Sequence, residues 1–466
     1  MRNINTYFSI AALATVMAVF SACNKSETRI LWQAVSAPSS PVSDAAPLSG
    51  NIKGTMLAGK TYTVNGDIFV NAGDTLMLQA GVTVQFTGRY GLGVKGSLIS
   101  LGTQANPNYF TFRGATKTDT YGYNPSADSA YVGRWIGIMG ATTSPMMIFK
   151  WTHIEFGGAP IPSSSAIAQI YASPYPMFFQ NPGGMLVFED SWLYGSTDDP
   201  FRILGGKIEI MRSTFEKCGY TSGEAMNAKA GTIGDFAYNL CIGMATNGPK
   251  LSNISAPVGY PGSNMHFYNN TLVNCGYRRA ATGRGGSIDF EQGAGGMAYN
   301  NLIVNCKFGL RVVQNPIADT ADLFYGYNYT YCDSSISANN IYPSLSVSTC
   351  ITKAEPTDMP VPSSFLPAGW QPGQTYTAPT SLYGANNPEF INGPVPMPAG
   401  LMLRDISFVG TYNFGLKTGS PCIGKGYTGF SPRADVPVDL TYGVTEITPP
   451  GSDIGAFQTN GSGNHH

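Results

Sequence analysis

The 466-residue sequence predicts an all-β protein built as a solenoid, in which short parallel strands wind into stacked coils. Three observations predict this fold. The 56 glycines and 32 prolines disfavour long helices. Only 12% of the residues are charged, too few to solvate many amphipathic helices, whereas 43% are hydrophobic, enough to build a core. A similar strand-like unit also recurs at short intervals, which is typical of repeat architectures.

The chain begins with a pattern that indicates export. Arg2 is followed by an apolar run over residues 10–20, and small residues lead into Cys23. This run is too short to span a bilayer, which takes about 18 apolar residues or more. The residues before Cys23 resemble the lipobox of bacterial lipoproteins, which implies cleavage after residue 22 and lipidation of Cys23. An ordinary secretory signal with an incidental cysteine is the alternative.

Residues 23–49 are rich in Ser, Ala and Pro, and they predict a flexible tether between the lipid anchor and the folded body. Several acyl chains on Cys23 would hold the protein stably on a membrane. We therefore expect an outer-membrane lipoprotein at the cell surface, with the periplasmic face as the alternative. The net charge of −1 lacks the basic excess of a nucleic-acid-binding protein, so we expect no nucleic-acid partner.

The recurring unit is a polar residue followed by alternating apolar positions, at intervals of 22 to 38 residues. Such intervals fit three short strands per coil with loops of variable length. Equivalent residues of neighbouring coils then stack about 4.8 Å apart. A buried asparagine at a bend can hydrogen-bond the backbone of the next coil, which predicts a structural role for four of these polar residues. They are Asn239, Asn270, Asn301 and Asn328.

Several segments resemble known β-helix proteins. GDTLMLQAGVTVQF (73–86) and the segment over 93–112 resemble the opening coils of right-handed parallel β-helix proteins of bacterial surfaces, and NNTLVNC and NNLIVNC resemble the pectate-lyase-like repeat. NPEFIN (387–392) and SDIGAFQ (452–458) resemble the closing module of exported β-helix proteins of Bacteroidetes.

The resemblance implies a right-handed parallel β-helix over 50–333 and a C-terminal closing module over 387–458. Between them we expect a Pro/Ser/Thr-rich irregular arm over 334–386, and after them a disordered tail over 459–466.

The cysteines after Cys23 fall into two groups. Cys332 and Cys350 could close an 18-residue loop as a disulfide, which would contribute about 3 kcal/mol. Four others each follow a similar apolar segment, so we expect small buried core residues there rather than metal ligands. These four are Cys218, Cys241, Cys275 and Cys306.

The strongest concentration of ionisable groups follows the Asn270 unit. Asp289 and Glu291 are two residues apart and would share one face of a strand. Three explanations stay open: surface ion pairing, binding of a ligand or Ca²⁺, and catalysis by Asp289, Glu291 and Arg284. No other cofactor is expected. The basic residues that would bind a ligand are Arg278 and Arg279, which share a glycine-rich loop with Arg284, and Lys307 and Arg311 one coil later.

Tyrosine-rich loops offer a second kind of binding surface. Tyr121 and Tyr123 could stack on sugar rings, as could the loops at 171–175 and 325–327, although packing within the protein is the alternative for all of them. Neither His153 nor His266 has a second histidine at metal-binding spacing.

Three functions fit these observations. Sparse ionisable groups favour a non-catalytic protein that binds a glycan or belongs to an outer-membrane uptake or adhesion complex. A lateral groove on a β-helix is also where lyases and hydrolases of similar fold act, so a polysaccharide lyase or glycoside hydrolase is the second possibility. A structural spacer is the third.

Overall fold

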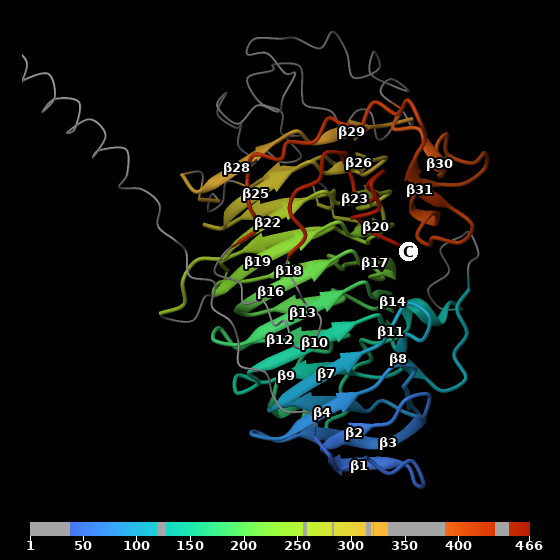
Figure 1. The fold of residues 1–466 in the computed structure, drawn as a ribbon, viewed down its shortest axis with the longest axis vertical. Helices are drawn as coiled ribbons and strands as arrows, with labels where there is room; N and C mark the ends of the chain where they lie inside the picture. The colour runs from blue at the N-terminus through green and yellow to red at the C-terminus, as the bar shows by residue number, and fades with distance from the viewer. Residues whose placement is uncertain are drawn as a thin grey trace, which may run out of the picture.

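The computed structural model describes residues 38–118, 127–254, 259–281, 284–313, 318–319, 321–333, 387–433 and 447–466. It is a right-handed parallel β-helix, which confirms the predicted fold class (Figure 1). The signal segment, Cys23, Tyr121, Tyr123, Cys350 and the 334–386 arm lie outside the described residues.

Each coil contains three strands, and equivalent strands of successive coils pair in parallel to form three ladders along the solenoid. Strand β3 (Thr61–Val70) is long enough to enter two of them, because residues 61–64 pair with β5 and residues 68–70 pair with β6. Ladder A contains β2 (Gly54–Met56), β4 (Thr75–Leu78), β7 (Ser97–Leu101), β10 (Met146–Lys150), β13 (Met185–Glu189), β16 (Gly206–Met211), β19 (Thr232–Ala237), β22 (Asn264–Tyr268), β25 (Gly295–Tyr299) and β28 (Leu323–Gly326).

Ladders B and C complete each coil. Ladder B contains the first part of β3, β5 (Thr83–Phe86), β8 (Asn108–Phe112), β11 (Thr152–Glu155), β14 (Trp192–Ser196), β17 (Thr214–Cys218), β20 (Leu240–Ile242), β23 (Thr271–Val273), β26 (Leu302–Val304) and β29 (Tyr329–Tyr331). Ladder C contains β1 (Leu48–Asn51), the second part of β3, β6 (Gly91–Val94), β9 (Gly137–Gly140), β12 (Met177–Phe179), β15 (Phe201–Ile203), β18 (Met226–Ala228), β21 (Pro249–Ser252), β24 (Asp289–Glu291) and β27 (Arg311–Val312).

The core fills the interior of the coil, because side chains alternate between the two faces of each strand and the apolar ones point inward. Aromatic rings of successive coils contact one another along it at tilted angles, for example Phe188, Phe215 and Phe236. The buried positions of Cys218, Cys241, Cys275 and Cys306 confirm the prediction that they are core residues.

The corner between ladders A and B explains the recurring polar residue. A residue in the left-handed region turns the chain there, such as Asn269 with φ 50°. The next residue points inward, and its side chain bonds the backbone of the neighbouring coil, as predicted for Asn239, Asn270, Asn301 and Asn328. The row extends to earlier coils through Asn108, Thr152, Ser191 and Ser213.

The described part of the expected tether, residues 38–49, is attached to the first coil. Pro41 bridges to Thr55, and the Val42 backbone N–H donates to the Thr55 carbonyl at 2.8 Å. Strand β1 then pairs with β3. Residues 38–49 therefore cover the strand edge at the base of the solenoid, where an unpaired edge would be open to other strands.

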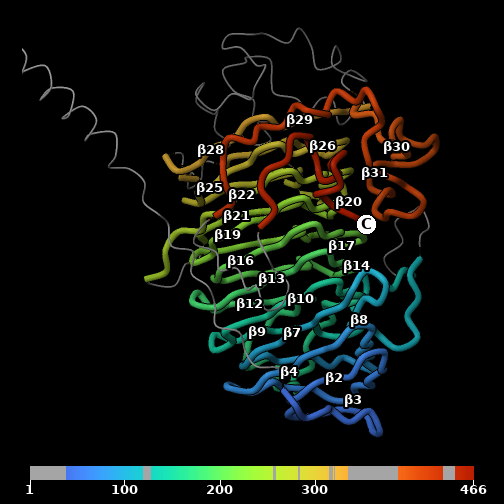
Figure 2. Tube along the Cα trace, viewed as in Figure 1, coloured from blue at the N-terminus to red at the C-terminus, as the bar shows by residue number. Residues whose placement is uncertain are grey.

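The C-terminal part of the chain covers the outer faces of ladders A and B. Strands β30 (Phe390–Asn392) and β31 (Asn413–Leu416) pair antiparallel, and this region packs on the outward apolar residues of ladder B, such as Val273. Residues 447–454 run along the corner between ladders A and B (Figure 2). Short 3-10 helices lie in the connections, η1 (Ser129–Tyr131) and η2 (Ala166–Gln169) between strands of the solenoid and η5 (Leu403–Asp405) in the closing region.

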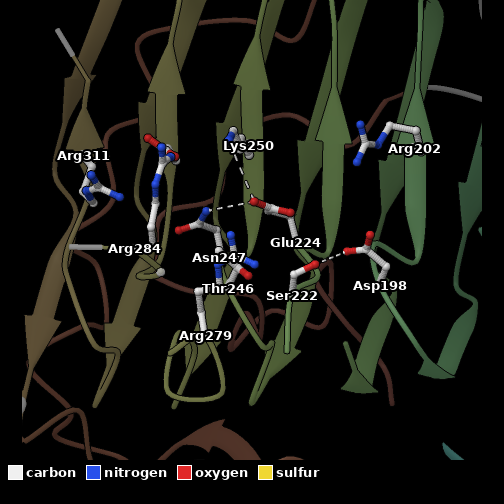
Figure 3. Close-up of a pocket in the computed structure, with 12 residues that line it drawn as sticks. Asp198, Arg202, Ser222, Glu224, Thr246, Asn247, Lys250, Arg279, Arg284 and Arg311 are labelled. Carbon is white, nitrogen blue, oxygen red and sulfur yellow. Dashed lines mark hydrogen bonds and ion pairs between the residues drawn. The ribbon is translucent and has the colours of Figure 1, made fainter. Parts of the chain in front are cut away.

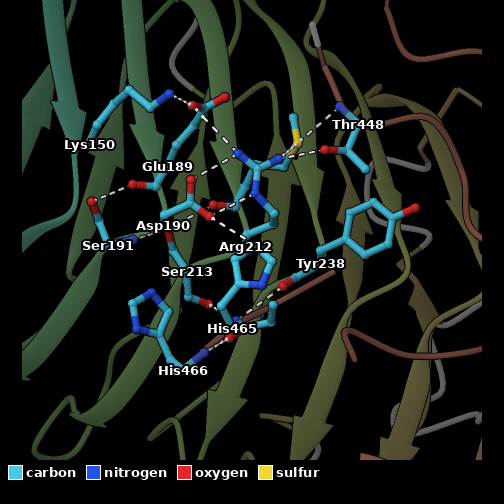
Figure 4. Close-up of polar contacts among 12 residues, drawn as sticks. Lys150, Glu189, Asp190, Ser191, Arg212, Ser213, Tyr238, Thr448, His465 and His466 are labelled. Atoms are coloured by element: carbon cyan, nitrogen blue, oxygen red, sulfur yellow. Dashed lines mark hydrogen bonds and ion pairs between the residues drawn. The ribbon is translucent and has the colours of Figure 1, made fainter. Parts of the chain in front are cut away.

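In place of the disordered tail expected over residues 459–466, the structure packs this segment along the same corner (Figure 4). The Asn464 amide donates to the Ser213 and Tyr238 carbonyls at 3.2 Å each. The His466 ring lies 5.0 Å from the Trp192 ring, centroid to centroid. The carbonyls and rings of the corner supply hydrogen-bond and packing partners for this segment.

Candidate functional site

A polar pocket of about 160 Å³ opens on the outer face of ladder C (Figure 3). Its side chains come from five successive coils. The residues that line it are Asp198, Arg202, Ser222, Glu224, Thr246, Asn247, Lys250, Arg279, Arg284, Gly285, Asp289 and Arg311.

Strand register builds the floor of the pocket. Five polar side chains occupy the same outward position on consecutive strands, because their neighbours in sequence, such as Leu251 and Phe290, point into the core. The strands lie about 4.8 Å apart, so these side chains form one continuous row. In order they are Arg202, Asn227, Lys250, Asp289 and Arg311.

The connections from ladder B to ladder C build the wall. Ser222 and Glu224 come from the loop before β18, Asn247 from the loop before β21, and Arg279 and Arg284 from the loop before β24. Each loop leads directly into its ladder C strand. The polar residues of these loops therefore lie beside the outward row. The loops differ in length, which is why these residues have no fixed spacing in the sequence.

Cations and carboxylates alternate across the pocket. The Lys250 ammonium lies 2.7 Å from the Glu291 carboxylate and 3.9 Å from that of Glu224, and Arg284 lies 3.8 Å from Glu291. Burial opposes the charge of Lys250, but Glu224, Asp289 and Glu291 together raise its pKa above the ordinary value. Lys250 therefore stays cationic.

Two carboxyl groups of the pocket hold protons more tightly than usual. Burial, aided by the nearby Asp199 carboxylate, raises the pKa of Glu224 to about 8. Burial also raises the pKa of Asp289, to about 6, against the opposing effect of Lys250 and Arg311. The pocket thus contains proton donors close to neutral pH beside fixed cations.

The structure brings together four of the residues predicted from the sequence. Arg279, Arg284, Asp289 and Arg311 line one pocket. Glu291 points outward from the same strand as Asp289, as expected from their spacing, and its carboxylate contacts Lys250 and Arg284.

Two other predicted ligand-binding residues do not line the pocket. The buried Arg278 guanidinium donates to the carbonyls of Cys218, Gly219 and Gly243, and it lies 5.0 Å from the centre of the Tyr131 ring. The Lys307 ammonium donates to the Arg279 carbonyl at 3.1 Å. Backbone carbonyls bind both cations. Their positions in the sequence, next to Arg279 and close to Arg311, do not reveal this.

Sequence reasoning missed Arg202, Glu224 and Lys250. These residues come from the three coils before β24, where they stand singly between apolar residues or in short loops. Aligning the ladder C strands Phe201–Ile203, Met226–Ala228 and Pro249–Ser252 with Asp289–Glu291 would have revealed one outward polar position in each. That alignment requires the strand register, which loops of unequal length conceal.

The described aromatic rings of the tyrosine-rich loops pack against other rings. Tyr171 stacks on Phe178 at 4.3 Å between centroids, and Tyr327 stacks on Tyr427 at 4.9 Å. Burial lowers the pKa of His153 to about 3, so it is a neutral ring between Tyr109 and Trp192.

Within the ranges given above, no group of three or more His, Cys, Asp or Glu side chains is arranged to hold a metal ion. In that same part of the chain, no helix has the length and apolarity needed to cross a membrane. No protein-family model, curated protein or solved structure matches this chain.

Proposed function

We propose that this protein is a glycan-binding protein that holds an acidic polysaccharide in the ladder C pocket without cleaving it. One observation carries the proposal: the outward row from Arg202 to Arg311, which continues across five coils. The pocket lining has five basic and three acidic side chains, so its net charge is +2 even when every carboxyl is ionised. An extended polymer with repeated carboxylate or sulfate groups matches this row, in which a cation stands on every second coil at Arg202, Lys250 and Arg311.

The chemistry of the pocket also suits a sugar. Arginine donors bind carboxylate or sulfate oxygens, and the Asn247 amide and Ser222 hydroxyl can exchange hydrogen bonds with sugar hydroxyls. The pocket lining contains no large apolar side chain, which argues against a lipid or a hydrophobic peptide.

Binding to polygalacturonate and to uncharged dextran, measured by affinity electrophoresis, tests the proposal. We expect retardation by polygalacturonate alone, and a several-fold weaker effect for Arg284→Ala. Arg89→Ala removes an exposed arginine at a distant coil and should bind like the wild type. Equal binding of both polymers, or no effect of Arg284→Ala, would contradict the proposal.

Cleavage is the second candidate function. The observation that favours it is the pair of carboxyls with raised pKa values, Glu224 and Asp289, beside Lys250, because a polysaccharide lyase or glycoside hydrolase needs a proton donor and an acceptor at the bond. The test is whether the protein releases unsaturated or reducing ends from polygalacturonate. Release by the wild type that is abolished in Asp289→Asn would show that the function is catalysis and not binding alone. No release by the wild type leaves binding in place.

We also propose the location. The export signal and Cys23 support an outer-membrane lipoprotein of the Bacteroidetes surface type with a pectate-lyase-like repeat, acting alone or in an uptake or adhesion complex. The attachment of residues 38–49 at the base of the solenoid leaves the pocket several coils away from the point where the described chain begins. Cys23→Ser should release the protein from the membrane fraction. A structural spacer would show neither glycan binding nor loss of function on mutation of the pocket.

A further inference from the structure

We infer that the pocket takes up protons when it binds an acidic ligand, so that it captures the ligand at acidic pH and releases it as the pH rises. The inference rests on the proposed function. Two carboxyl groups, Glu224 and Asp289, carry it, because each is buried among the cations of the pocket and lacks full compensation of its charge.

The contacts of Glu224 show why its negative charge is poorly compensated. The nearest cation, Lys250, lies 3.9 Å away and is already paired with Glu291 at 2.7 Å. The amide donors from Asn227 and Asn247 are long, at 3.4 and 3.5 Å. By contrast, the neighbouring Asp199 takes the Arg202 guanidinium at 2.6 Å and the Glu224 backbone N–H at 2.9 Å.

Asp289 has a different environment with the same consequence. It stands between Lys250 and Arg311 in the outward row, yet its Oδ1 atom is buried and accepts no hydrogen bond from any described residue. A buried carboxylate oxygen without a donor favours the protonated form of the group.

The charged groups around the two carboxyls come from every coil of the site. Glu224 is surrounded by Asp199 and Arg202 from the preceding coil and by Lys250 from the following coil. Asp289 is surrounded by Lys250, Arg311, Glu291 and Glu224. Lys229 lies close to Lys250 and Arg202, and burial together with those cations lowers its pKa to about 8.

An acidic ligand adds negative charge beside both carboxyls. Their pKa values, already raised to about 8 and about 6, rise further when the ligand is bound, so the complex holds more protons than the free protein. Protonation of both groups also increases the net charge of the lining from +2 to +4. The affinity for an anion must therefore fall with rising pH, by up to about tenfold per pH unit for each proton taken up.

Calorimetric titration between pH 5.5 and 9 tests the inference, with dextran sulfate as the probe because its sulfate groups do not titrate in this range. We expect at least about tenfold weaker binding at pH 9 than at pH 5.5. Repeating the titration in buffers of different ionisation enthalpy should reveal proton uptake on binding. Polygalacturonate should show the same trend, since its carboxylates stay ionised above pH 5.5.

Variants identify the groups responsible. Glu224→Gln should flatten the dependence near pH 8, and Asp289→Asn should flatten it near pH 6. Asp44→Asn is the control, because this exposed carboxylate at the base of the solenoid lies outside the pocket, and it should keep the slope. Binding that is equally tight at every pH, or a slope unchanged in both variants, overturns this inference and leaves the proposed function standing. No binding of either polymer at any pH overturns both.

Discussion

The Asn270 side-chain oxygen accepts the backbone N–H of Asn239, 31 residues earlier, at 2.9 Å. The Asn270 side-chain amide donates to the Phe236 carbonyl of the same earlier coil, also at 2.9 Å. Asn301 has the same relation to Asn270. One side chain thus satisfies a buried donor and a buried acceptor of the neighbouring coil, which stabilises the turn between ladders A and B.

Asn270→Ala should destabilise the solenoid. It leaves the Asn239 N–H and the Phe236 carbonyl without partners in a buried site, at a cost of about 1–3 kcal/mol for each unsatisfied group. Chemical denaturation followed by circular dichroism measures the loss. Asn328→Ala, at the last corner of the row and only partly buried, should cost less. Equal stability of Asn270→Ala and the wild type would show that the row is not a stabilising feature.

Arg278→Lys should destabilise the protein while leaving glycan binding unchanged. The guanidinium holds the Cys218, Gly219 and Gly243 carbonyls at once, and a lysine cannot reproduce that planar set of donors. We expect a loss of about 2–4 kcal/mol in the free energy of unfolding. Arg279→Lys, in the pocket, is the control. If Arg278→Lys were as stable as the wild type but bound the polymer more weakly, Arg278 would be part of the binding surface.

Glu209→Gln should stabilise the protein at neutral pH. Burial, reinforced by the Glu189 carboxylate, raises the pKa of Glu209 well above its ordinary value, and neither oxygen accepts a hydrogen bond from a described residue. The unfolded chain loses this proton at the ordinary pKa, whereas the folded protein retains it. Wild-type stability therefore falls as the pH rises from the ordinary value towards the raised one.

Thermal unfolding of Glu209→Gln between pH 4 and 8 checks this prediction. Its advantage over the wild type should grow with pH. Glu216→Gln is the matched control, because both Glu216 oxygens accept hydrogen bonds, from the Trp192 indole at 3.0 Å and the Val409 backbone at 2.7 Å. That substitution should destabilise. If the stability of Glu209→Gln varied with pH as that of the wild type does, Glu209 would not be protonated in the folded protein at neutral pH.

Asn464→Ala tests the packing of the C-terminal segment. It removes the donor to the Ser213 and Tyr238 carbonyls, so we expect a loss of about 1–3 kcal/mol. Release of the segment should also change tryptophan fluorescence, because the adjacent His466 ring contacts Trp192. Asn460→Ala, in the exposed part of the segment, should leave both signals unchanged. A segment that is mobile in solution would make the two variants indistinguishable.

The repeat was predictable because every coil has the same local structural requirement at one of its corners. Each coil needs a polar residue at the corner between ladders A and B, and Asn239, Asn270 and Asn301 supply it at visible intervals. At earlier corners such as Ser213 a serine takes the place of asparagine, so the repeat was visible there but its hydrogen-bonding role was not predicted.

The candidate site was only partly predictable. Asp289 and Glu291 share a strand, so their common face followed from spacing alone. Glu224 and Lys250 reach the same pocket from earlier coils through loops of different length, and Arg278 turns away from its neighbour Arg279. Spacing within one strand does not determine which residues meet between coils.

The sequence by itself determined the all-β class, the three-strand coil, the buried cysteines and the asparagine row, since all of these depend on periodicity and on the local needs of a turn. Only the tertiary structure decided that Arg202, Lys250, Asp289 and Arg311 form one row, that Arg278 is an internal support and that the C-terminal residues lie along the solenoid. The physical reason is that parallel pairing sets the register between coils, and the electrostatics of a pocket depend on that register.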